Sequence, residues 1–137
     1  MVDDNQLKEI LLAAHTIATV GFSTSPDKPA YYVPEYLVAQ GYQVIPVNPT
    51  THEIMGMKSY PDLLAVPEKV DVVQIFRRSE DVPPIVAQAI RIGAKVVWMQ
   101  EGIKNEPAAR QAEAAGLIVV MDKCMMKNHR RLIGAKE

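Results

Sequence analysis

A loop rich in hydroxyl groups follows the first short apolar run of the chain. Its residues are Gly21, Phe22, Ser23, Thr24, Ser25, Pro26, Asp27 and Lys28. A glycine allows backbone to approach a ligand closely, and hydroxyl and ammonium groups can bind phosphate oxygens. The free N–H groups at the start of a following helix would add to the binding of an anion. The loop therefore has two interpretations, a diphosphate-binding loop or an ordinary polar loop with a serine N-cap.

The loop matches neither the G-x-G-x-x-G dinucleotide motif nor the phosphate-binding P-loop. A nicotinamide dinucleotide site usually also has an acidic residue after the second strand, which binds the ribose hydroxyls. Here Val47, Asn48 and Pro49 stand at that place. The sequence thus disfavours an NAD(H)-binding redox sensor, which stays an alternative.

Two further segments follow apolar runs and supply candidate contacts to a ligand. They are Phe76-Arg77-Arg78 and Gln100-Glu101-Gly102. The guanidinium of Arg77 can pair with phosphate or stack on a ring, whereas Arg78 is predicted to lie on the surface. Trp98 is assigned to the core.

Cys124 is the only cysteine of the chain and precedes a predicted short helix. The positive end of a helix favours a thiolate, and His129 is the nearest candidate base in the sequence. One hypothesis is therefore an enzyme that processes a thioester with Cys124 and His129. The alternatives are a small buried apolar residue or a contact to a ligand.

Composition limits the class of protein. A chain of 137 residues is long enough for one domain, which we expect to span residues 1–137. The net charge of -1 gives no basic field for nucleic acid or anionic lipid. A single cysteine excludes an internal disulfide, the acidic start does not resemble a signal peptide, and no apolar run approaches the roughly 20 residues of a membrane span. We expect a soluble cytoplasmic protein.

The elements that must position these residues alternate along the chain. Short runs rich in β-branched residues predict strands at Thr16–Gly21, Gln43–Val47, Val70–Phe76, Ala94–Met99 and Leu117–Met121. Helical spacing predicts helices at Asp4–Ala14, Pro29–Gln40, Val82–Ile92 and Glu106–Ala115. The first helix is expected to cover an edge of the sheet. The connection Pro49–Pro67 is irregular, with a helical turn near Tyr60–Ala65.

This alternation predicts an α/β fold, a Rossmann-like three-layer αβα sandwich around a five-stranded parallel sheet. In such sheets ligands bind beyond the carboxyl ends of the strands, where the strand order reverses. The loop at Gly21–Lys28 and the segments near residues 48, 77 and 101 all follow strands, so they are expected to meet at that crevice.

The combined segments resemble a known family. The runs VGFSTSPDKPAYYV, GYQVIPVNP, VDVVQIFRRSEDVPPIV, IGAKVVWMQEGI and MDKCMMKNHRRL are similar to the small stand-alone coenzyme A-binding proteins of bacteria. Those proteins resemble the N-terminal domain of the succinyl-CoA synthetase α subunit. The resemblance implies that residues 21–28 hold the phosphates of coenzyme A. It also implies that the segments at 47–49, 76–77 and 100–102 line the crevice, with Cys124 near the pantetheine arm.

The resemblance favours a module that binds coenzyme A or a short acyl-CoA. The synthetase α subunit has a second domain with a phosphorylated histidine, and its partner has the nucleotide-grasping fold. Neither part is found in these 137 residues, so acyl-CoA synthesis by this chain alone is not expected. A site that has lost its ligand and only mediates protein contacts is a further alternative. A homodimer through the leading helix or a sheet edge is left open, and no protein partner is indicated.

Overall fold

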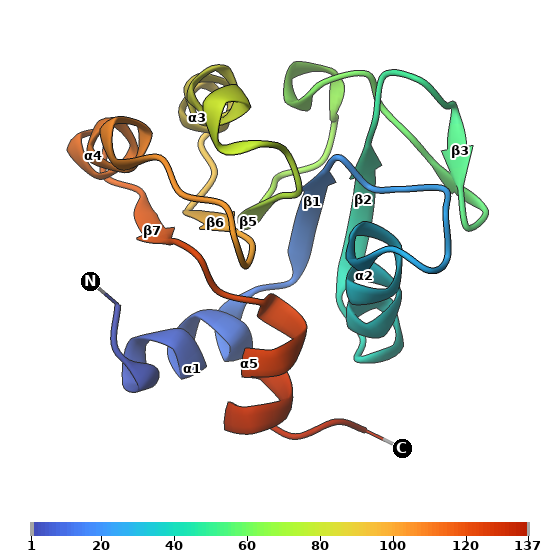
Figure 1. Cartoon of the computed structure of the whole chain (residues 1–137), viewed down its shortest axis with the longest axis horizontal. Coiled ribbons are helices and arrows are strands. Elements are labelled where there is room, and N and C mark those ends of the chain that lie inside the picture. The colour runs from blue at the N-terminus through green and yellow to red at the C-terminus, as the bar shows by residue number, and fades with distance from the viewer. Residues whose placement is uncertain (1, 137) are drawn as a thin grey trace.

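A parallel sheet of five strands forms the centre of the computed structural model, which describes residues 2–136 (Figure 1). The strands are β1 (Thr16–Val20), β2 (Gln43–Val47), β5 (Val72–Ile75), β6 (Val96–Met99) and β7 (Ile118–Val120). Their order across the sheet is β2-β1-β5-β6-β7, and all neighbours are parallel. The chain therefore reverses its direction of winding between β1 and β5, and this is the switch point at which doubly wound sheets bind ligands.

Helices cover both faces of the sheet (Figure 1). One face carries α1 (Asp4–Ala13), α2 (Pro29–Ala39) and α5 (Met125–Leu132), and the other carries α3 (Val82–Arg91) and α4 (Glu106–Ala114). This confirms the predicted Rossmann-like αβα sandwich. The predicted strands and helices are all present, and their ends differ from the predicted ends by no more than two residues.

The strands are buried because both of their faces lie under helices. Ile17 and Trp98 pack with α1, α2 and α5, whereas Ala18 and Val97 pack with α3 and α4. Successive residues of one strand thus belong to opposite cores, which explains the nearly continuous apolar runs in the sequence.

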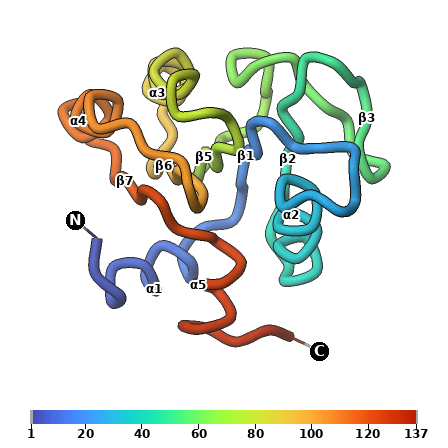
Figure 2. The backbone as a smooth tube through the Cα atoms, viewed as in Figure 1, coloured from blue at the N-terminus to red at the C-terminus, as the bar shows by residue number. Residues whose placement is uncertain are grey.

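The leading helix packs on a face of the sheet, on the side that ends in the edge strand β7. Leu7, Ile10 and Leu11 of α1 are buried in the same cluster as Val72 and Val96 of the central strands. Since α2 lies over β1 and β2 and α5 is short, α1 covers the remaining part of that face. Figure 2 shows the segment after β7 running across to α5, which packs beside α1.

The irregular connection after β2 contains a small hairpin that the sequence did not reveal. The strands β3 (Glu53–Ile54) and β4 (Met57–Lys58) pair antiparallel around Met55 and Gly56, which both have positive φ. A methionine with positive φ gives no recognisable turn signal. The expected helical turn is the 3₁₀ helix η1 (Leu63–Ala65), and a second 3₁₀ helix, η2 (Ser79–Asp81), precedes α3. Among residues 2–136, no helix has the length and apolar character to cross a membrane.

Candidate functional site

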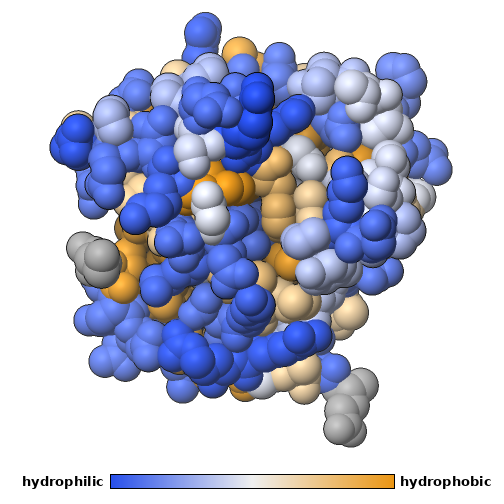
Figure 3. Space-filling view, in the orientation of Figure 1, coloured by the Kyte–Doolittle hydropathy of each residue, from blue (hydrophilic) through white to orange (hydrophobic). Residues whose placement is uncertain are grey.

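A cavity of about 450 Å³ opens at the carboxyl ends of β1, β5 and β6, between α2 and α5. We call it the switch-point cavity. Its lining residues are Lys28, Pro29, Ala30, Tyr32, Val33, Phe76, Arg77, Arg78, Gln100, Glu101, Ile103, Cys124, Met126 and Lys127. Figure 3 shows apolar side chains at the floor of a hollow on this face, with hydrophilic residues around it. An elongated ligand with an apolar part and charged groups fits such a site.

The rim of the switch-point cavity is mainly cationic. Arg78 is bound to Glu80 and Asp81 at 3.1 and 3.2 Å, and it is mostly exposed, as predicted. Within residues 2–136, neither Lys28 nor Arg77 has a carboxylate partner within 4.0 Å. These two cations are therefore available to an anionic ligand without the loss of an existing ion pair.

Gly21 lies at the switch point itself. Its φ is +87°, and a Cβ atom there would lie 2.4 Å from the carbonyl oxygen of Phe76. The glycine thus allows the backbones that leave β1 and β5 to touch, which sets the base of the crevice. This requirement comes from the protein's own packing, and it holds whether or not a ligand approaches.

The loop after Gly21 is ordered by its own hydrogen bonds. Pro34 in α2 has no N–H, and the carbonyl of Ala30, four residues earlier, instead accepts a 3.0 Å hydrogen bond from the N–H of Ser23. The Ser23 hydroxyl in turn accepts from the N–H of Ser25 at 3.0 Å. The proline in α2 therefore helps to fix the loop against that helix.

Several predicted contact residues lie away from the switch-point cavity. Phe22 is fully buried and packs edge-to-face on Tyr31, and its carbonyl accepts a 2.8 Å hydrogen bond from the amide of Asn48. Asn48 thus connects the loops after β1 and β2. Gly102 is exposed and donates its N–H to Asp122. The cavity lining does not include Gly21, Phe22, Ser23, Thr24, Ser25, Val47, Asn48, Pro49 or Gly102.

A smaller cavity of about 180 Å³ lies on the β2 side of the same crevice. Val47, Pro49 and Arg77 line it, together with residues of η1 and α3. Arg77 lines both cavities, so it stands between them. Of the predicted residues, the structure thus places Val47, Pro49 and Arg77 on this smaller cavity. The switch-point cavity holds Lys28, Phe76, Gln100, Glu101 and Cys124, as well as Arg77. The other predicted residues, which are residues 21–25, Asn48 and Gly102, line neither cavity.

A buried polar network joins the sheet to the start of α5. The Thr19 hydroxyl donates to Gln74, the Gln74 amide donates to the Gln100 side-chain oxygen, and that oxygen also accepts from the N–H of Met125. These contacts are 2.8, 3.2 and 2.9 Å long. Gln100 was predicted as a ligand contact. It is 3 % exposed, and its observed partners fix α5 beside the switch-point cavity.

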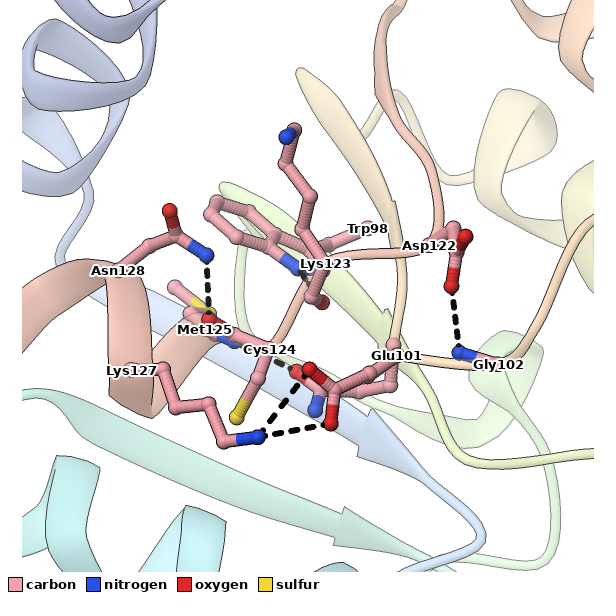
Figure 4. Close-up of polar contacts among 10 residues, drawn as sticks. Trp98, Glu101, Gly102, Asp122, Lys123, Cys124, Met125, Lys127 and Asn128 are labelled. Carbon is pink, nitrogen blue, oxygen red and sulfur yellow. Dashed lines mark hydrogen bonds and ion pairs between the residues drawn. The ribbon is translucent and has the colours of Figure 1, made fainter.

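Cys124 is the N-cap residue of α5 and lines the switch-point cavity, although it is only 5 % exposed. His129 is engaged elsewhere: its Nδ1 is 2.8 Å from the hydroxyl of Tyr36, and its ring packs against Tyr36 and Tyr42. The histidine thus joins α5 to α2. The groups beside the thiol are Lys127 and Glu101, whose ion pair is 2.9 Å long (Figure 4).

Another hollow, of about 290 Å³, lies at the opposite end of the sheet. It is bordered by α1 and by the residues that begin β5, β6 and β7. Ligands of parallel α/β sheets bind at the carboxyl ends of the strands, so the switch-point cavity is the better candidate.

Comparison with known proteins identifies the family. The profile of the CoA binding domain matches residues 15–130, which include all five strands of the sheet. The chain belongs to the CoA-binding domain family. This CoA-binding domain is also homologous to the N-terminal domain of ADP-forming acetyl-CoA synthetases.

The relatives of the domain are of two kinds. It is 37 % identical over 124 residues to the uncharacterized protein YneT of Bacillus subtilis, covering 90 % of this chain and 92 % of YneT. A solved structure of a hypothetical protein from Pyrococcus horikoshii is 44 % identical with a TM-score of 0.95, covering 97 % and 94 % of the two chains. The ADP-forming acetate–CoA ligase II of Archaeoglobus fulgidus is 30 % identical over 94 residues, which are 66 % of this chain but 14 % of the ligase.

Some residues that line the cavity of this CoA-binding domain were not predicted from the sequence. The most informative are Tyr32 of α2 and Met126 and Lys127 of α5. Tyr32 and Met126 follow from helical spacing once the start of each helix is known. Lys127 is the third residue of α5, and its spacing from the N-cap Cys124 could have indicated that their side chains are neighbours.

Proposed function

We propose that this protein binds coenzyme A or a short acyl-CoA in the switch-point cavity and acts as a binding module, as a carrier, sensor or accessory subunit. The observation that carries the proposal is the combination of two findings. The chain belongs to a CoA-binding domain family, and the cavity at the strand-order switch has two cations on its rim, Lys28 and Arg77, that pair with no carboxylate of residues 2–136. Coenzyme A carries a diphosphate and a ribose phosphate, which such cations bind.

The two parts of the ligand match two parts of the cavity. Lys28 and Arg77, which both line the cavity, bind the phosphates in this proposal, whereas residues 21–25 lie outside the lining. The pantetheine arm lies over apolar groups such as Tyr32, Ile103 and Met126, with its sulfur near Cys124. The absence of an acidic residue at Val47-Asn48-Pro49 supports coenzyme A over a nicotinamide dinucleotide.

Isothermal titration with coenzyme A, beside NAD, NADH and ATP, tests the proposal. Lys28→Ala is expected to weaken coenzyme A binding by about 1–3 kcal/mol, or roughly 5- to 150-fold, because it removes a charge-assisted hydrogen bond to phosphate. Lys8→Ala is the matched control, since Lys8 is an exposed lysine of α1 outside the cavity lining. Tighter binding of NADH than of coenzyme A, or equal effects of the two variants, would contradict the proposal.

A further inference from the structure

The start of α5 brings a thiol, an amine and a carboxylate together in the switch-point cavity. Cys124 and Lys127 are the N-cap and third residues of the helix, positions whose side chains face one another. Lys127 Nζ lies 2.9 and 3.2 Å from the two oxygens of Glu101. Figure 4 shows the Cys124 sulfur and the Lys127 ammonium extending toward the same place, next to Glu101.

We propose that Lys127 is acylated by the bound acyl-CoA, with Cys124 as the intermediate acyl carrier. This inference rests on the proposed function, because the thioester must be held in the cavity. It assigns to the protein a single self-modification at a lysine rather than repeated turnover.

Both steps balance without a further reactant. The Cys124 sulfur attacks the thioester carbonyl, the bond from that carbonyl to the coenzyme A sulfur breaks, and the released thiol takes up the proton that Cys124 loses. The uncharged Lys127 amine then attacks the carbonyl of the new thioester and forms an amide, and the bond from that carbonyl to the Cys124 sulfur breaks. The second proton that the nitrogen loses goes to the Cys124 sulfur and restores the thiol. Glu101 accepts the proton that the ammonium must lose and passes it to water.

The ion pair explains why the thiol is needed first. Glu101 hydrogen-bonds to the ammonium and raises the pKa of Lys127 above its usual value, so few of the amines are uncharged at neutral pH. If the Lys127 amine attacked the thioester of acyl-CoA directly, it would have to lose its proton during the short time for which each acyl-CoA stays bound. A thioester on Cys124 keeps the acyl group beside the amine until it loses its proton, which replaces an encounter in solution by an intramolecular step.

Mass spectrometry of the intact protein incubated with excess acetyl-CoA tests the inference, with peptide mapping to locate the acetyl group. We expect one acetyl amide at Lys127, and competition by free coenzyme A should suppress it. In Cys124→Ala its formation should fall at least about 100-fold, a contribution typical of one positioned catalytic group. In Lys127→Arg the acetyl group should instead accumulate on Cys124 as a thioester that hydroxylamine removes.

Lys123→Arg is the matched control, because Lys123 is next to Cys124 in sequence but lines a different hollow. It should leave acetylation of Lys127 unchanged. Titration of each variant with coenzyme A separates the two proposals. Binding of coenzyme A without acetylation of Lys127, or acetylation that survives Cys124→Ala, would overturn the inference and leave the binding function intact. Absence of coenzyme A binding to the unmodified protein would overturn both.

Discussion

Several single residues determine the shape of the site through contacts within the protein. Asn48 connects two loops, and Gln100 accepts hydrogen bonds from both a strand side chain and the N-terminus of a helix. Gly21 allows two strands to leave the sheet in contact. These residues shape the switch-point cavity through the protein's own contacts, whereas Lys28 and Arg77 remain available to a ligand.

Gly21→Ala is expected to destabilise the protein more than a change at a comparable glycine. The positive φ costs an alanine roughly 1–2 kcal/mol, and the clash with the Phe76 carbonyl adds about 1–3 kcal/mol of overpacking. Gly116→Ala is the control: its φ is +90°, but among residues 2–136 no atom beyond the adjacent residues lies within 4 Å of its added Cβ. Urea unfolding of both variants measures the difference. Equal losses of free energy of unfolding would show that the contact with Phe76 does not matter.

Among the elements, the spacing of apolar residues and the glycines at helix ends were enough to predict the strands of the sheet and its helices. Gly41, Gly93 and Gly116 end helices with positive φ, as their places before predicted strands indicate. The residues of the site were harder to predict. A place after a strand shows that a residue lies near the crevice, but it does not show whether the side chain points into the crevice or into the core. Phe22 follows β1 as a ligand contact should, yet its side chain turns into the core. His129 is close to Cys124 in sequence, but the helix directs its ring toward Tyr36.

The interface between α2 and α5 is expected to weaken in acid because of His129. Burial lowers the pKa of His129 below its ordinary value of 6.5, and the charge of Lys136 lowers it further. Arg130, whose guanidinium lies 4.8 Å from the Tyr36 ring, adds another positive charge nearby. The unfolded chain therefore binds a proton more readily than the folded chain. Stability should fall as the pH drops below 6.5, and the loss should be complete below the pKa of the folded state.

Urea unfolding between pH 8 and pH 5 measures this dependence, and His129→Asn is the informative variant. Asparagine can keep a hydrogen bond to the Tyr36 hydroxyl but does not titrate. It is expected to be less stable than the parent near neutral pH and to lose less stability on acidification. An identical pH slope in the two proteins would assign the acid sensitivity to other groups.

In the molecule as a whole, the helices on the two faces of the sheet contribute unequally to the site. The switch-point cavity lies between α2 and α5 on one face, and the end of β7 and the helix α4 contribute no residue to it. The site thus brings the start of α2 next to the start of α5, and the ends of β5 and β6 lie between them. A ligand there joins segments that are about a hundred residues apart in the sequence.

Hydrogen exchange with and without coenzyme A tests that division. Bound ligand should slow exchange at the amides of residues 22–33 and 123–128, because it suppresses local opening of the segments that it contacts. Amides of α4 that exchange by local fraying should be unaffected, and they serve as the internal control. Amides that exchange only on global unfolding should also slow, because the ligand stabilises the folded state. This added stability is about 2.7 kcal/mol at a ligand concentration of 100 times Kd. Protection of α4 equal to that of the start of α5 would mean that the ligand binds elsewhere, since fraying at α4 has no contact with the switch-point cavity.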